Sequence, residues 1–278
     1  ALPRVFVTGD QLLAEHIPAG IRSRKVVAKS ALESLEPLAL QAAMSALIKQ
    51  LPATDWQRME IYLADQHVHL MALPAVHNSG NSAGLSNSEQ SAYARVLLMQ
   101  TYGDAAGAWP FRIQDVPQSQ SSLLVTIPAL QGLTLQTLLT PRKYVQVSVQ
   151  PYATALWSQS KLPPDGSVVT AEPQMLRLLQ LQNGAVLHVS SLTSDVSDTD
   201  AVSAWLLRER MLLGAQATPC YWLSESGCVS ANEAGRRLSK ALAGQLSMQQ
   251  LQSNRAITSL WPEVKHSAIK PAEVMHVA

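Results

Sequence analysis

The chain has 278 residues, of which 47% are hydrophobic and 15% charged, and its 21 basic and 20 acidic residues give a net charge of +1. This much apolar material excludes a wholly disordered chain, and the length suggests about two domains of ~150 residues each. The densest basic run, residues 22–25, is short. The sequence therefore lacks the basic face of a nucleic-acid-binding protein and predicts no nucleic-acid partner.

The chain carries no sign of a membrane segment or of a disulfide framework. No stretch approaches the ~18 consecutive apolar residues of a membrane span, and the first residues lack the features of a signal peptide. We therefore expect a soluble chain, or the soluble portion of a membrane-anchored protein. The two cysteines, Cys220 and Cys228, form no CxxC motif and have no second Cys/His pair to complete a zinc site. We interpret both as small buried or half-buried thiols, which fits a reducing compartment.

Apolar runs and turn signals predict an α/β pattern in the first half of the chain. Strands are expected at 4–8 and 25–29, and a helix over 30–50 begins either with Ser30 as its N-cap or after Pro37. Further along, the sequence predicts strands at 60–64, 68–73, 109–114 and 123–127, and helices at 86–103 and 130–139.

The helix that begins near residue 86 has the clearest boundaries. Ser86 and Glu89 have the spacing of a capping box, and Gly103 is a natural C-terminal stop. The small, polar, glycine-bearing residues 78–87 before it predict a mobile surface loop.

The second half of the chain is more regular. Asn183-Gly184 is a strong hairpin signal, because both positions tolerate a positive φ, and Gly214 closes a predicted helix. The predicted elements are, in order, a strand at 144–149, a helix at 151–160, strands at 167–171, 175–181 and 185–190, a helix at 198–213, a strand at 219–223, a helix at 231–242 and a strand at 257–261.

This order of elements indicates the fold class. Three consecutive strands followed by alternating helices and strands are the ribonuclease H-like layout, and the first half gives a looser version of it. Two such lobes in tandem describe an actin-like arrangement, although the sequence shows no internal repeat. We predict an α/β fold of two ribonuclease H-like lobes, at 1–142 and 143–261, followed by an irregular C-terminal tail at 262–278.

No catalytic or metal-binding constellation stands out. His67 and His69 lie near Asp65 and would share one face of a strand, but no third or fourth ligand accompanies them. Cys228 lies in a turn-like string without a neighbouring base to activate it, and the sequence has no nucleophile elbow, P-loop or G-x-G-x-x-G. We therefore predict no enzyme activity, no cofactor, and no catalytic, cofactor-binding or metal-ligating residue.

Two groups of stretches carry a family resemblance. They are VHLMALP (68–74), SEQSAYA (88–94) and YGDAA (102–106) leading to Trp109, and then Trp157, Asp165-Gly166, VVTAEP (168–173), LRLL (176–179), Asn183-Gly184 and WLLRE (205–209). Together they cover most of 68–214. They resemble the cytoplasmic actin-like L component of the type II secretion inner-membrane platform and the actin-like M protein of type IV pilus assembly.

The resemblance implies a non-enzymatic scaffold of a secretion or pilus assembly platform. Such a protein would act in the cytoplasm or at the cytoplasmic face of the inner membrane, and would recruit partner proteins there. Its own association with the membrane would be peripheral or through a tether. The alternative is an ATP-binding actin-like ATPase of the same fold class.

The turns that hold phosphates in true actin-like ATPases are acidic, glycine-bearing hairpins, one in each lobe. Their counterparts here would be Gly9-Asp10-Gln11, whose Gly and Asp stand in the wrong order, and Ala171 to Gln174, with Ser226-Gly227 as a weak adenosine-side turn. The second turn has no glycine, Pro173 lacks an N–H donor, and Glu172 would face a bound phosphate with like charge. The pattern therefore predicts a degenerate member that binds ATP poorly, in which Glu172→Ala leaves partner binding unchanged.

Overall fold

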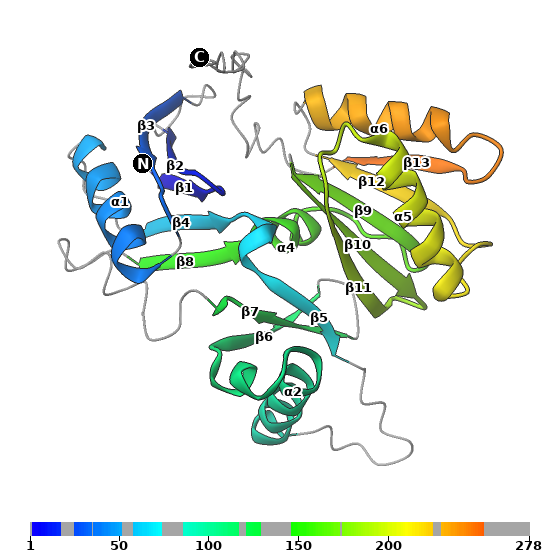
Figure 1. The fold of residues 1–278 in the computed structure, drawn as a ribbon, viewed down its shortest axis with the longest axis horizontal. Coiled ribbons are helices and arrows are strands. Elements are labelled where there is room, and N and C mark those ends of the chain that lie inside the picture. The colour runs from blue at the N-terminus through cyan, green and yellow to red at the C-terminus, as the bar shows by residue number, and fades with distance from the viewer. Residues whose placement is uncertain are drawn as a thin grey trace, which may run out of the picture.

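The computed structural model describes residues 2–17, 25–34, 36–51, 58–73, 86–116, 121–128, 146–172, 174–224 and 229–252 (Figure 1). These residues form two five-stranded sheets and one three-stranded sheet, together with the helices that accompany them. Several predicted features lie outside them: most of the loop at 78–87, the helix at 130–139, Cys228, the strand at 257–261 and the tail at 262–278.

The first sheet has the strand order β3-β2-β1-β4-β8, in which the first three strands are antiparallel neighbours and β1, β4 and β8 are parallel neighbours. Its strands are β1 (Leu2–Val7), β2 (Gln11–Ile17), β3 (Lys25–Ala31), β4 (Arg58–Leu63) and β8 (Gln146–Pro151). The sequence did not predict β2, because Gln, Leu, Ala and Glu favour helices. Pairing with β1 overrides that preference.

Helix α1 (Pro37–Gln50) covers this sheet and begins at Pro37, next to the predicted start after that residue. Ser30 is not its N-cap: it lies within β3, and Glu36 precedes the first turn. The helix buries Leu40, Met44 and Leu47, each at most 1% exposed. Proline is tolerated at the first helical position because the N–H there has no intrahelical partner.

The second sheet repeats the topology of the first, with the order β11-β10-β9-β12-β13. Its strands are β9 (Gly166–Glu172), β10 (Met175–Gln182), β11 (Ala185–Thr193), β12 (Cys220–Ser224) and β13 (Met248–Gln252), and its helices are α5 (Thr199–Leu212) and α6 (Val229–Ala241). The predicted pair of ribonuclease H-like lobes is confirmed. Strand β13 was not predicted, because its Gln-rich sequence lacks the β-branched residues typical of strands.

The predicted hairpin between β10 and β11 is confirmed by its backbone angles. Asn183 has φ 51° and Gly184 has φ 74°, the positive values that a type I′ turn requires at both central residues. Asp165 accepts a hydrogen bond from the Asn183 N–H at 2.7 Å, which fixes the turn to the loop before β9.

A small unit is inserted between β4 and β8. It contains the 3₁₀ helices η1 (Asp65–His67) and η2 (Asp104–Ala108), helix α2 (Asn87–Tyr102) and the strands β5 (His69–Leu73), β6 (Phe111–Asp115) and β7 (Ser122–Thr126) in the order β5-β7-β6. The predicted capping box is present, since the Ser86 N–H donates to Glu89 Oε2 at 2.8 Å, and Gly103 ends the helix with φ 86°. One face of the small sheet packs on α2, and the other joins the main core through Leu70 and Leu123.

Both large sheets share one apolar core. Phe6 and Ile61 of the first sheet belong to the same buried cluster as Val168, Leu179 and Leu223 of the second. Helix α4 (Tyr152–Ser158) lies at this junction, and all but its last residue are buried. The predicted division at 142/143 stays a prediction. It assigns β8 to the second lobe, whereas β8 pairs with β4 in the first sheet.

Candidate functional site

A buried polar cluster lies where the two lobes and the small unit meet. It consists of Asp65, Glu172 and Arg177, and we call it the junction cluster. Asp65 opens η1 directly after β4, Glu172 is the last residue of β9, and Arg177 lies in β10. Because β4 runs parallel to β1 and β8, and β9 runs parallel to β12, the cluster occupies the carboxyl-end edge of these parallel strands, where open α/β sheets usually bind ligands.

The three side chains are almost fully buried and bond across the junction. Asp65 is 2%, Arg177 4% and Glu172 6% exposed. The backbone N–H of Asp65 donates to both carboxyl oxygens of Glu172, at 3.0 and 3.1 Å. Arg177 Nη2 donates to the backbone oxygens of Asp65 and Val68, and its Nε lies 3.5 Å from Asp65 Oδ2. The second lobe thus satisfies backbone groups of the segment that joins β4 to β5.

The cluster holds two carboxyl groups against a single guanidinium. Burial raises the pKa of Glu172 well above its usual value of 4.5, and the neighbouring Asp65 raises it further. Burial also raises the pKa of Asp65, although Arg177 and the N–H of Ala153, 3.3 Å from Asp65 Oδ1, act against this. A side-chain hydrogen bond joins the two carboxyl groups. Glu172, which lacks the close guanidinium contact, is therefore the residue that keeps a proton.

The β1–β2 turn lies beside the cluster and is closed by its own hydrogen bonds. Thr8 N–H donates to Gln11 O at 2.9 Å, and Thr8 Oγ1 donates to Asp10 Oδ1 at 3.0 Å. The Gln66 side chain of η1 packs so closely on Gly9 that a Cβ there would collide with its amide nitrogen. Gln66 therefore covers one side of this first-lobe turn, whose Gly9 and Asp10 remain exposed.

The predicted histidine pair does not share a face. His67 lies in a 3₁₀ helix rather than a strand, and its Nε2 donates to Thr8 O at 2.8 Å. His69 lies in β5 and stacks on Trp109, with ring centroids 5.4 Å apart and an interplanar angle of 10°. Burial lowers the pKa of both imidazoles, partly offset at His67 by its bond to Thr8, and Arg177 lowers that of His69 further. The two rings thus have separate structural partners.

The environment of Glu172 in the second-lobe turn differs from the one that the sequence predicted. Glu172 is not available to face a bound phosphate, because its carboxyl group is buried against Asp65. Its removal would disturb the contact between the lobes, and the expectation that Glu172→Ala leaves partner binding unchanged stays a prediction. Pro173 and residues 226–227 lie outside the described residues. Cys220 is buried, which raises the pKa of its thiol to about 11 and makes it unreactive.

Sequence reasoning missed Arg177 and Asp65 as members of a site. A usable signal was present, because Arg177 interrupts the apolar run of β10, and all but the last residue of this strand are buried. A charged residue in a buried strand requires a buried partner. The sequence could not identify that partner, since Asp65 is more than a hundred residues away.

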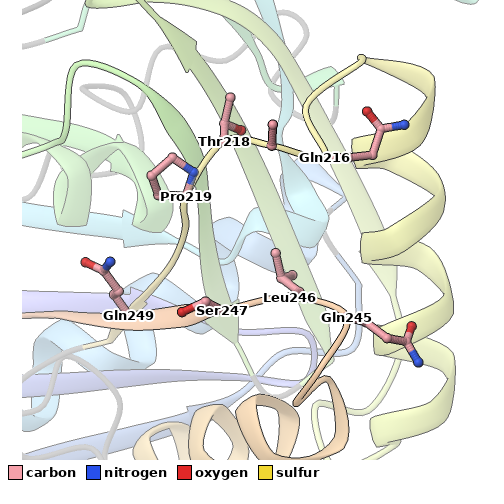
Figure 2. A pocket seen from close by; sticks show the side chains of 8 residues that line it. Gln216, Thr218, Pro219, Gln245, Leu246, Ser247 and Gln249 are labelled. Carbon is pink, nitrogen blue, oxygen red and sulfur yellow. The ribbon is translucent and has the colours of Figure 1, made fainter.

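A pocket lies away from this cluster, between the loops that lead into β12 and β13 (Figure 2). Its volume is about 250 Å³, and its lining residues are Gln216, Ala217, Thr218, Pro219, Gln245, Leu246, Ser247 and Gln249. None of these side chains is charged. Beneath it, the buried Arg210 donates to the backbone oxygens of Gln216 and Thr218. The guanidinium thus holds the loop in place instead of facing the pocket.

Comparison with known proteins identifies the fold. No family model and no curated sequence matches the chain. Among solved structures, a protein of Bacteroides thetaiotaomicron with an actin-like ATPase fold and unknown function superposes with a TM-score of 0.59, at 10% identity over 90% of both chains. The chain has the actin-like fold.

A solved structure from a pilus assembly system also has a similar fold. The PilM–PilN type IV pilus biogenesis complex matches with a TM-score of 0.54 and 12% identity, over 88% of this chain and 86% of the other. The cytoplasmic domain of EpsL, an inner-membrane component of the Vibrio cholerae type II secretion system, gives 0.45 and 13% over 80% and 81%. The predicted resemblance to the M protein of pilus assembly is thus confirmed at the level of the actin-like fold.

Two further observations concern the part of the actin-like chain that the structure describes. Within it, no helix is long and apolar enough to cross a membrane. The same residues contain no group of three or more His, Cys, Asp or Glu side chains placed to hold a metal ion.

Proposed function

We propose that the chain is a non-enzymatic scaffold of a bacterial type IV pilus or type II secretion assembly platform. It recruits partner proteins at the cytoplasmic face of the inner membrane. The observation that carries the proposal is the junction cluster. The edge where the fold would bind a ligand is filled by buried side chains of the chain itself, which bond to its backbone and include the Arg177–Asp65 ion pair. An actin-like fold whose ligand-binding edge is filled by its own side chains is suited to contacts with proteins rather than to phosphate chemistry.

Exposed apolar side chains on the small unit support a role in binding proteins. Tyr93, Val96, Met99 and Tyr102 of α2 are 38% to 49% exposed. They follow one another at intervals of three residues, which makes each a neighbour of the next in a ridge on the helix surface. Helix α2 lies on the far side of the small sheet from the two large sheets (Figure 1), which leaves this ridge open to a partner.

Co-purification with the pilus and secretion proteins of the same genome tests the scaffold. We expect the wild-type chain to retain an inner-membrane component of one such platform. The double variant Val96→Ser with Met99→Ser should lose that component while keeping its melting temperature. Leu38→Ser is the matched control, because Leu38 is 80% exposed on α1, and it should bind as wild type does. Intact pilus and secretion machines in a deletion strain would rule the proposal out.

A further inference from the structure

We propose that the junction cluster is a proton-operated clamp: one proton held between Glu172 and Asp65 keeps the small unit and both lobes together, and its loss at higher pH loosens the contact. This inference does not depend on the proposed scaffold function. It rests on which elements the cluster joins and on its balance of charge.

The cluster joins three parts of the molecule through few contacts. Asp65 belongs to the segment leaving the first sheet, Val68 leads into β5 of the small unit, and Ala153 lies in α4. From the second lobe, Glu172 accepts the Asp65 N–H, and Arg177 donates to the Asp65 and Val68 oxygens. A change in the charge of Glu172 therefore acts on all three parts at once.

The charges around Glu172 are incompletely balanced. Arg177 provides the one positive charge, and Asp65, its ion-pair partner, faces Glu172 as a second acid. The segment that leads to β5 adds His67, whose ring bonds to Thr8, and β5 adds His69; burial keeps both rings neutral near pH 7 by lowering their pKa. Tyr102 of α2 is neutral there too, because burial raises its pKa.

The other described elements around the cluster add no compensating charge. Helix α4 contributes only the backbone N–H of Ala153. In the β1–β2 turn, Asp10 is exposed and bonded to Thr8. If both acids of the cluster ionise, two buried negative charges therefore oppose one positive charge, an arrangement that a protein interior disfavours.

The hydrogen-bond pattern fits a neutral Glu172. Its carboxyl group accepts the Asp65 N–H, and it shares a side-chain hydrogen bond with the Asp65 carboxylate. A protonated carboxyl can do both, because it has a carbonyl oxygen that accepts and an O–H that donates. Two ionised carboxylates cannot share a hydrogen bond, since neither carries a hydrogen.

The direction of the pH effect follows from the raised pKa of Glu172. The folded protein keeps a proton that the unfolded chain has already released above about 4.5. The stabilisation is fully present below that ordinary value, and it is lost as the pH rises through the raised value of the folded state. Loosening is therefore expected on the alkaline side.

Glu172→Gln tests the clamp, because an amide reproduces the protonated acid with one accepting oxygen and a donating nitrogen but cannot ionise. Hydrogen exchange and thermal unfolding would be measured over a pH series that runs upward from about 5, above the ordinary pKa of a glutamate, with exchange corrected for its intrinsic pH dependence. In the wild type, we expect the amides of residues 65–73 to exchange about tenfold faster at the upper end of this pH series than at its lower end. Over the same series, Tm should fall by about 3 °C. Glu172→Gln should remove both changes.

Two further variants keep the test decisive. Glu60→Gln changes a carboxyl of the Arg4 pair outside the cluster and should retain the wild-type pH dependence. Glu172→Ala removes the acceptor of the Asp65 N–H and should exchange rapidly at every pH. A wild type whose exchange and Tm do not change with pH, or a Glu172→Gln protein that follows the same pH profile as wild type, would overturn the proposal.

Discussion

The two lobes have the same strand order and differ in how their first hairpin turns are used. In the first lobe, the turn after β1 is exposed at Gly9 and Asp10 and is covered on one side by Gln66. In the second lobe, the end of β9 places Glu172 in the buried contact with Asp65. The same topology thus yields a surface turn in one lobe and an inter-lobe anchor in the other. Topology fixes where a turn lies, and a few side chains decide what it contacts.

The lobes also differ in what joins their last two strands. Among the described residues, this connection contains helix α6 in the second lobe, whereas in the first it contains the small unit with α2, β5, β6 and β7. The insertion brings its own sheet against the second lobe, where Ser121 Oγ accepts the Val186 N–H at 2.9 Å. Because the inserted unit packs against the second lobe, it is this lobe that provides Glu172 and Arg177, the residues that bond to the segment leading into the unit.

The largest expected effect comes from removing the one cation of the junction cluster. Arg177→Met leaves Asp65 and Glu172 buried without a guanidinium, and it removes the donors to the Asp65 and Val68 oxygens. Loss of one partner from a buried pair costs about 3–5 kcal/mol. Urea unfolding measures it, with Arg208→Met as the control, because the Arg208 side chain is 63% exposed. A loss no larger than that of the control would show that the second lobe is not anchored by this residue.

A smaller effect is expected at the hairpin that belongs to the second lobe alone. Gly184 has φ 74°, and Gly184→Val forces a β-branched side chain into that region at a cost of about 1–3 kcal/mol. Gly184→Asn should cost less, because asparagine tolerates positive φ. Equal melting temperatures for the wild type and both variants would mean that the turn does not need these angles.

The smallest effect is expected at the first-lobe turn. Gly9→Ala places a Cβ against Gln66, the end of a flexible side chain that can move aside. The expected loss is about 1 kcal/mol or less. Adding Gln66→Ala should restore most of it, and a double-mutant cycle by urea unfolding measures the coupling. A loss as large as that of Gly184→Val would mean that the first-lobe turn is held as rigidly as the second.

Local signals in the sequence predicted much of the fold and little of the junction. The capping box at Ser86 and the Asn183-Gly184 turn depend on neighbouring residues, and both are confirmed. Strand β2 was missed because its pairing with β1 overrides its helix-forming composition. The partnership of Asp65 with Arg177 joins residues far apart in the chain, so no local pattern could reveal it.

Calorimetric titration of the purified chain with Mg-ATP tests the central claim most directly. If the junction is filled by the chain's own side chains, ATP should bind no tighter than about 1 mM, which corresponds to about −4 kcal/mol. The wild type and Glu172→Gln should then give the same weak or undetectable heat. A micromolar dissociation constant that Glu172→Gln abolishes would contradict the account, because it would make the junction a nucleotide site.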